Sequence, residues 1–239
     1  SFSGTIADAA GGAAAAISSG DLGSVTVDGD APDFTACTAT DDSYGVGETL
    51  QITCTWDEAV VTTDGTLSLN NGDTAAYASG SGTTSLVFST TIAEGDTAES
   101  DVAVSSYGGT IADAAGGAAG AASGDLGAVI IDGDAPDLSS VVDTTGDGAY
   151  GVGETISITV TWDEAVVVTG SPTLTLGNSA SAAYTSGSGS TALVFDYVVA
   201  ESDGSTGDLT VTAWTGGTIK DAAGGAAAAT GTVDLGTVS

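Results

Sequence analysis

Apolar and polar residues alternate strictly in two stretches of the chain, residues 50–56 and 156–162. In both stretches every second residue is apolar, and each ends on a tryptophan, Trp56 or Trp162. The residues between the apolar ones are glutamine, serine or threonine. A period of two predicts a β-strand with one face in a core and the other face in water.

Shorter segments with the same character follow, separated by turns rich in glycine, aspartate and serine at intervals of about 8–12 residues. This spacing predicts an all-β sandwich with about seven strands in each domain. The further strands are predicted at residues 66–69, 75–78, 85–91 and 101–105, and again at 173–176, 182–185, 192–198 and 208–213.

Two phrases show that the chain is a tandem repeat. Gly-Thr-Ile-x-Asp-Ala-Ala-Gly-Gly occurs three times, with its aspartate at Asp8, Asp113 and Asp221, so the period is about 105 residues. Tyr-Gly-Val-Gly-Glu-Thr occurs at 44–49 and at 150–155. The body of the repeat is therefore present twice, and its tail three times.

We predict two domains, residues 28–131 and 132–239, each large enough to bury its own core. Residues 1–27 duplicate the tail of a repeat without its body and form an extra terminal strand segment. Two explanations fit this offset. Either the sequence is a window from a longer array, or residues 1–27 add as a donor strand to the sheet of a neighbouring molecule.

The charge of the chain excludes some classes of function. The chain has 32 acidic residues and one basic residue, Lys220, so its net charge is −31. It contains no histidine. A nucleic-acid reader needs a cationic surface for phosphates, so nucleic acid is not an expected partner. No apolar run reaches the roughly 18–20 residues that span a bilayer, so membrane insertion is not predicted. Such self-repulsion is tolerable where salt screens it or bound cations neutralise it.

We predict that the chain is not an enzyme. Without histidine or arginine, the usual nucleophile–base pairs and phosphate clamps cannot be built. The remaining possibility is catalysis by two carboxylates, as in glycosidases, and the candidate Asp-Glu pairs are residues 57–58 and 163–164. Adjacent residues of a strand point to opposite faces, however, so neither pair forms a facing dyad by itself.

The two cysteines occupy positions that are apolar in the second repeat. Cys37 corresponds to Val141 and Cys54 to Val160. We predict a Cys37–Cys54 disulfide between adjacent strands; the alternative is two reduced, buried thiols. A disulfide indicates an oxidising, extracellular compartment.

The order of these phrases is similar to the bacterial immunoglobulin-like tandem repeats of large secreted adhesins, surface-layer and other cell-surface proteins. The resemblance implies tandem immunoglobulin-like β-sandwiches, and it covers essentially the whole chain. It implies less about function, because such repeats serve as spacers, adhesive units and filament subunits. The similar segments are residues 132–136, 150–155, 161–166, 184–189 and 216–225.

Calcium at the joints between domains is the predicted cofactor, a prediction that the resemblance favours. Calcium takes six to eight oxygen ligands, and each joint carries three aspartates within six residues. We expect the joint to meet the loop of Asp113 and the strand end at residues 163–164. The alternative is that these are solvated aspartates of an acidic surface. The predicted ligands are Asp28, Asp30 and Asp33 at the first joint, Asp132, Asp134 and Asp137 at the second, and Asp113, Asp163 and Glu164.

From these features we predict a structural subunit of an extracellular filament, sheath or surface layer, or the stalk of a giant cell-surface adhesin. Its expected partners are further copies of itself in a polymer, or the continuation of a longer array. The alternative is a carbohydrate-binding adhesive module for surface glycans, with Tyr77, Tyr184 and Trp214 as a stacking platform.

Overall fold

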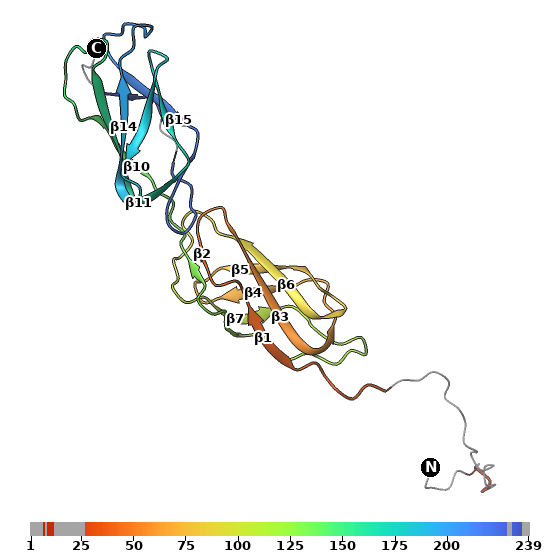
Figure 1. Cartoon of the computed structure of the whole chain (residues 1–239). Coiled ribbons are helices and arrows are strands. Elements are labelled where there is room, and N and C mark those ends of the chain that lie inside the picture. Colours follow the sequence, from red (N-terminus) through yellow and green to blue (C-terminus); the bar gives the residue numbers. More distant parts are fainter. Residues whose placement is uncertain (1–6, 8, 12–26, 229–230, 236–239) are drawn as a thin grey trace. The chain divides into compact units, whose positions relative to one another are not determined.

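The computed structural model describes residues 7, 9–11, 27–228 and 231–235 (Figure 1). The chain divides into two units, Ser1–Asp30 and Ala31–Ser239, which are described separately. The donor-strand role predicted for residues 1–27 concerns a segment that lies largely outside the described residues. The described residues form an all-β protein, as predicted, and contain no helix able to cross a membrane.

The first repeat forms one antiparallel sheet of seven strands in the order β1-β3-β6-β5-β4-β7-β8. Strand β1 also lies close to β8, so the two edges of this sheet approach each other and the sheet is nearly closed. The strands are β1 Phe34–Thr38, β3 Thr49–Val60, β4 Thr66–Leu69, β5 Thr74–Ser79, β6 Thr83–Thr91, β7 Ala103–Gly108 and β8 Gly124–Asp125. In the first repeat a separate parallel pair joins β2 (Ser43–Tyr44) to β9 (Ile130–Ile131).

The second repeat has the same topology, in the order β10-β11-β14-β13-β12-β15-β17, with β16 paired to the end of β11. The strands of the second sheet are β10 Leu138–Asp143, β11 Thr155–Thr169, β12 Thr173–Leu176, β13 Ser181–Ser186, β14 Ser190–Val198, β15 Thr210–Thr215, β16 Thr218–Lys220 and β17 Val233–Asp234.

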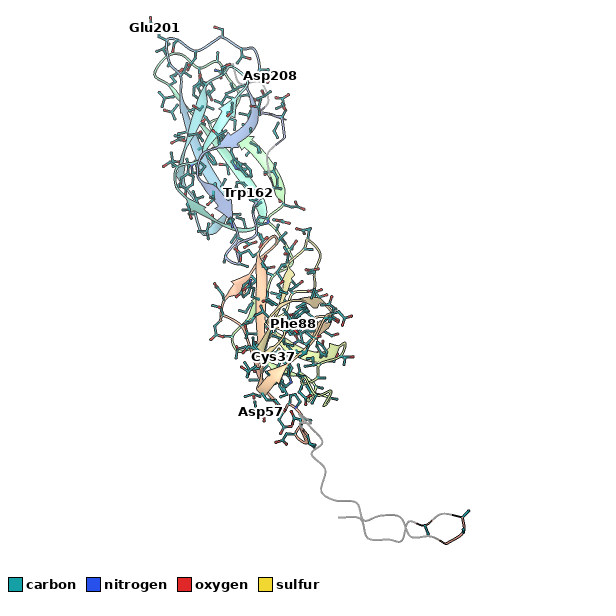
Figure 2. All side chains as sticks on the ribbon, turned by 90° about the vertical axis from the view of Figure 1, so that its right-hand side faces the viewer. Cys37, Asp57, Phe88, Trp162, Glu201 and Asp208 are labelled. Carbon is teal, nitrogen blue, oxygen red and sulfur yellow. A yellow bond between two sulfur atoms is a disulfide. The ribbon has the colours of Figure 1, made fainter. Side chains whose placement is uncertain are left out.

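The core of each repeat is built on the alternating strands that the sequence predicts. Strands β3 and β11 bury every second side chain along most of their length, up to Trp56 and Trp162. Phe88 and Trp162, labelled in Figure 2, are among the largest fully buried side chains. The polar residues between the apolar ones lie on the opposite, more exposed face. This alternation suits a long strand with one face in the core.

The predicted disulfide between Cys37 and Cys54 is confirmed. The two residues lie opposite each other where β1 pairs with β3. Val141 and Val160 are paired in the same way where β10 meets β11. The first repeat thus has a covalent bond at a place where the second repeat has a contact between two valines.

Candidate metal centre

Asp221 is fixed by the turn that directly follows β16. One carboxylate oxygen, Oδ1, accepts hydrogen bonds from the backbone N–H groups of Ala223, Gly224 and Gly225 at 2.7, 2.7 and 3.0 Å. The phrase Asp-Ala-Ala-Gly-Gly permits this turn because its residues are small and Gly224 has a positive φ of 105°. The side chain is only 5% exposed, so its orientation is set by buried hydrogen bonds.

The second carboxylate oxygen of Asp221, Oδ2, is buried and has no hydrogen-bond partner among the described residues. A side chain at Gly225 would collide with this atom, so the glycine leaves room beside it. Oε1 of Glu164 is also buried and without a partner in the described part of the chain. Buried polar atoms are nearly always paired, so two such oxygens in one place call for a further partner, a water molecule or a cation.

Asp132 completes this group, which we call the joint cage: Asp132, Glu164 and Asp221. Each residue offers a carboxylate oxygen, and these oxygens lie within 4.8 Å of one another. They come from three places: the segment after β9, the strand β11, and the turn after β16. The cage can hold a metal ion, and three carboxylates so close together repel one another strongly unless a cation lies between them.

The electrostatics of the cage are most evident at Glu164. Burial first, and then the negative charges of the neighbouring aspartates, together raise its pKa from 4.5 to about 7; these aspartates are Asp221, Asp132, Asp134 and Asp163. In the cation-free protein Glu164 therefore takes up and releases its proton near neutral pH, well above the usual range of a glutamate.

This raised pKa predicts a pH dependence for the calcium-free protein. The folded state binds the proton of Glu164 more tightly than the unfolded state, so this stability is fully present below about pH 4.5 and is lost as the pH rises through about 7. After allowance for solvent screening it amounts to about 1 kcal/mol, or a fall in Tm of about 4 °C between pH 5 and pH 8. Thermal unfolding of wild type and Glu164→Gln checks it; an equal pH dependence in both would contradict the assignment.

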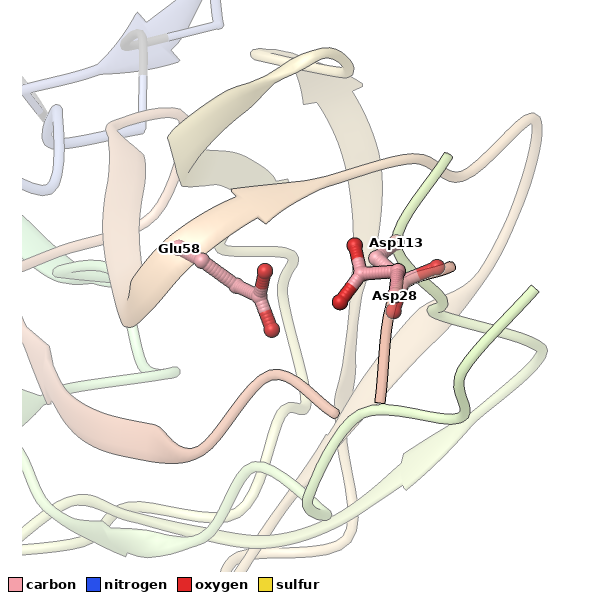
Figure 3. Close-up of side chains that lie close together, drawn as sticks. All are labelled: Asp28, Glu58 and Asp113. Atoms are coloured by element: carbon pink, nitrogen blue, oxygen red, sulfur yellow. The ribbon is translucent and has the colours of Figure 1, made fainter. Parts of the chain in front are cut away.

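The first repeat holds the matching residues Glu58 and Asp113. Figure 3 shows Glu58 on β3 and Asp113 on the segment after β7. Asp113 is 7% exposed, and its Oδ1 accepts from the N–H groups of Ala115, Gly116 and Gly117 at 2.7, 2.6 and 2.9 Å.

Asp113 resembles Asp221 in a second way: its other carboxylate oxygen, Oδ2, is buried without a hydrogen-bond partner among the described residues. The Gly117 N–H, ahead of those of Gly116 and Ala115, holds the pKa of Asp113 below its usual value against the opposing effect of burial. Asp113 is therefore charged at neutral pH. In the sequence repeat, Asp28 is the residue that corresponds to Asp132.

The other predicted ligands have other partners. The Asp137 N–H donates to Asp163 Oδ1 at 2.8 Å, and the Asp163 N–H donates to the Asp137 carbonyl at 3.0 Å. Asp33 is bonded to Asp57 in the same way in the first repeat. Asp134 is exposed, and its N–H donates to Asp132 Oδ1 at 3.3 Å.

Asp30 takes the corresponding place in the unit Ser1–Asp30, where its N–H donates to Asp28 Oδ1 at 3.3 Å. The aspartates at positions 33, 137 and 163 thus fix the start of each sheet, and those at 30 and 134 shape the turn before it. Neither kind of contact needs a cation.

Sequence reasoning did not name Glu58 and Asp221 as metal ligands. Both could have been found by carrying each candidate across the repeat, since Glu58 corresponds to Glu164 and Asp221 to Asp113. The prediction grouped Asp113 with Glu164, whereas the structure groups Glu164 with Asp221. The turns that begin at Asp113 and Asp221 therefore lie beside the acidic strands of their own repeats.

The aromatic residues considered for glycan stacking pack against the cores. Tyr77 and Tyr184 are in edge contact with Phe88 and Phe195, with ring centroids 6.0 and 5.7 Å apart. Trp214 is in edge contact with Trp162. All three side chains are partly buried against these cores.

Comparison with known proteins gives no assignment. No protein-family model matches the chain, and no curated protein matches it in sequence.

Proposed function

We propose that this chain is a structural subunit of an extracellular filament, sheath or surface layer, whose tandem repeats are stiffened at their joints by calcium. The observation that carries the proposal is the pair of buried, unpartnered oxygens, Asp221 Oδ2 and Glu164 Oε1, beside Asp132. The residues that bear them are otherwise well ordered by backbone hydrogen bonds and strand pairing.

Calcium fits this donor set better than other ions. All three side chains are carboxylates, and hard cations such as calcium take oxygen ligands, with carboxylates binding through one oxygen or both. There is no histidine in the chain, and both cysteines are in a disulfide, so the nitrogen and sulfur ligands that favour zinc are absent. The carbonyl oxygen of Asp134 lies next to Gly225 and supplies a further neutral donor near the cage.

A cation in the joint cage would stiffen the connection between repeats. Asp132 lies on the connecting segment, and its N–H donates to the carbonyl of Tyr44 in the first repeat at 3.0 Å. Glu164 and Asp221 belong to the second repeat. One ion bound to all three would therefore tie the connecting segment to the second repeat while its backbone stays bonded to the first.

The strand order supports an immunoglobulin-like fold for the repeats. In that fold one sheet has the order A-B-E-D and the other C-F-G. The order β1-β3-β6-β5 followed by β4-β7-β8 has this topology, with the two groups joined through β5 and β4. The resemblance to the repeats of secreted surface proteins points the same way, and the disulfide is typical of an extracellular compartment.

Electron microscopy and sedimentation of the purified chain, with calcium and after chelation, test the proposal. We expect ordered polymers in calcium that loosen or shorten when it is removed, because the joints become flexible and repel one another. Glu164→Gln should resemble the chelated protein even in calcium. Particles that remain monomeric with and without calcium would contradict the assembly role.

A further inference from the structure

The segment that connects the two repeats is bonded to both of them almost without a gap. The Gly95 N–H donates to the carbonyl of Gly133 at 2.8 Å, so the first repeat holds the chain up to this glycine. The Ala228 N–H donates to the carbonyl of Pro136 at 2.9 Å, so the second repeat holds the chain from this proline onward. Only residues 134–135 lie between the two attachments. A connection of this length keeps the facing surfaces of the two repeats close together.

The first repeat presents a well-fixed turn at this junction, residues 45–48. The Glu48 N–H donates to the carbonyl of Gly45 at 3.0 Å and closes the turn. The Gly47 N–H donates to the carbonyl of Ile92 at 2.8 Å, and the Ile92 N–H donates to the carbonyl of Glu48 at 2.9 Å. Ile92 is 1% exposed, so the turn is anchored on the core of its own repeat.

The second repeat presents the turn of Asp221, residues 221–225, to the same place. A Cβ added at Gly45 would lie 2.9 Å from the carbonyl carbon and oxygen of Ala223, and closer still to the nitrogen of Gly225. These three nearest atoms are all backbone atoms of the other repeat, and backbone cannot swing aside as a long side chain can. Gly45 is itself buried. The two turns therefore pack backbone against backbone, a close approach that requires glycine at this position.

A second contact joins the same two turns. Oε1 of Glu48 lies 3.9 Å from Nζ of Lys220, the residue before Asp221. The Glu48 carboxylate also lies against Gly224, where an added Cβ would collide with it. Lys220 is the one basic residue in a chain with 32 acidic residues. Both side chains of the pair are partly exposed, so the pair adds little binding energy, but it makes the contact complementary in charge.

We propose that residues 44–48 of the first repeat and residues 220–225 of the second form a docking interface that holds the two repeats at one angle. The partner of this surface is thus the next repeat of the same chain. The inference rests on the proposed structural function and deepens it, because it identifies the surfaces that make the array stiff. Without such an interface, relative motion of neighbouring domains is the default.

The docking interface and the joint cage share a turn, so each affects the other. Asp221 belongs to the cage and begins the docking turn, and the N–H of Asp132 donates to the carbonyl of Tyr44, directly before Gly45. Without a cation, the carboxylate of Asp132 repels those of Asp221 and Glu164, and this repulsion opposes docking. A bound cation removes the repulsion. Cation binding and docking should therefore strengthen each other by the same factor.

The distance between spin labels on the two repeats tests the proposal. The labels are attached at Thr84→Cys and Thr191→Cys of the full chain, which are exposed and equivalent positions of the two repeats. The native cysteines are paired with each other and do not take a label. Pulsed electron paramagnetic resonance gives the distribution of distances, in calcium and after chelation. The variant under test is Gly45→Leu, and the matched control is Gly151→Leu, because Gly151 is the same residue of the second repeat and is exposed.

We expect the labelled parent chain to give a narrow distribution in calcium and a broader one after chelation. Gly45→Leu should give a distribution at least about twofold broader than that of the parent in calcium, whether or not calcium is present. It should also bind calcium about fivefold less tightly, because docking and cation binding are linked. Gly151→Leu should match the parent chain in both measurements.

A second variant keeps the test independent of any folding defect in Gly45→Leu. Glu48→Lys brings two cations together at the contact, and it should broaden the distribution in calcium in the same direction and by less. Circular dichroism checks that each variant is folded. Unchanged distributions in the folded variants, or equal broadening in Gly45→Leu and Gly151→Leu, would overturn the interface.

The outcomes separate the interface from the proposed calcium role. If the parent chain is narrow with and without calcium while Gly45→Leu is broad in both, the interface stands and calcium in the joint cage is not what stiffens the joint. If calcium narrows Gly45→Leu as fully as the parent chain, the joint cage stands and the interface is overturned.

Discussion

Replacing Asp221 by alanine is expected to lower the free energy of unfolding of the second repeat by about 3–5 kcal/mol. The change removes the carboxylate that accepts three backbone N–H groups in a buried turn. Those donors cannot reach water without opening the turn, which explains the size of the effect. Chemical denaturation in the absence of calcium measures it. Asp147→Ala, at an exposed position of a loop, is the control and should change stability by less than about 0.5 kcal/mol.

Asp221→Asn separates the two roles of this residue. The amide oxygen still accepts the three hydrogen bonds, so the fold should persist, and the loss of one negative charge relieves Glu164 when calcium is absent. With calcium present, the variant should gain little stability where the wild type gains about 2.7 kcal/mol at a hundredfold excess over Kd. An unchanged calcium response in Asp221→Asn would show that Asp221 is not a ligand.

The disulfide should account for the next largest effect, and only in the first repeat. The double variant Cys37→Val and Cys54→Val copies the Val141–Val160 pair of the second repeat, so it keeps an apolar contact while removing the covalent bond. For a sequence separation of 17 residues, we expect a loss of about 3 kcal/mol.

Denaturant unfolding, followed through Trp56 for the first repeat and Trp162 for the second, measures this loss. Reductant should destabilise the wild type and leave the double variant unchanged. The result that would count against the disulfide as a stabilising bond is an equal midpoint for the two proteins.

The parts of the fold that could be predicted are those with a local or repeated signal. Strands β4 and β12 were predicted with the bounds that the structure gives, because turns punctuate the sequence on both sides of them. The Cys37–Cys54 bond followed from aligning the repeats, since both cysteines replace valines of a strand pair. Strands β3 and β11 were predicted from their period-two alternation, because side chains of a strand point alternately to its two faces and only one face is buried.

The short pairings could not be predicted. Strands β9 and β16 have two and three residues, too few to show a period, and they form only because the folded sheets place β2 and the end of β11 beside them.

The candidate site was predicted in part. Asp132 and Glu164 were named from charge and spacing, and the structure brings them together. The third ligand is Asp221, 57 residues beyond Glu164, and the sequence alone does not tell which copy of the repeated turn lies near which joint. That choice is made by the pairing of β16 with the end of β11, a tertiary contact.

The most direct test of the central claim is the number of calcium ions bound per chain, measured by equilibrium dialysis of wild type and Glu164→Gln at the same pH and salt. We predict that the wild type binds one more tightly held calcium ion than Glu164→Gln, because the substitution removes a ligand from the joint cage while leaving the acidic surface otherwise intact. Equal numbers in the two proteins would contradict the account, since calcium would then associate with the acidic residues only as a non-specific counterion and not at a defined site.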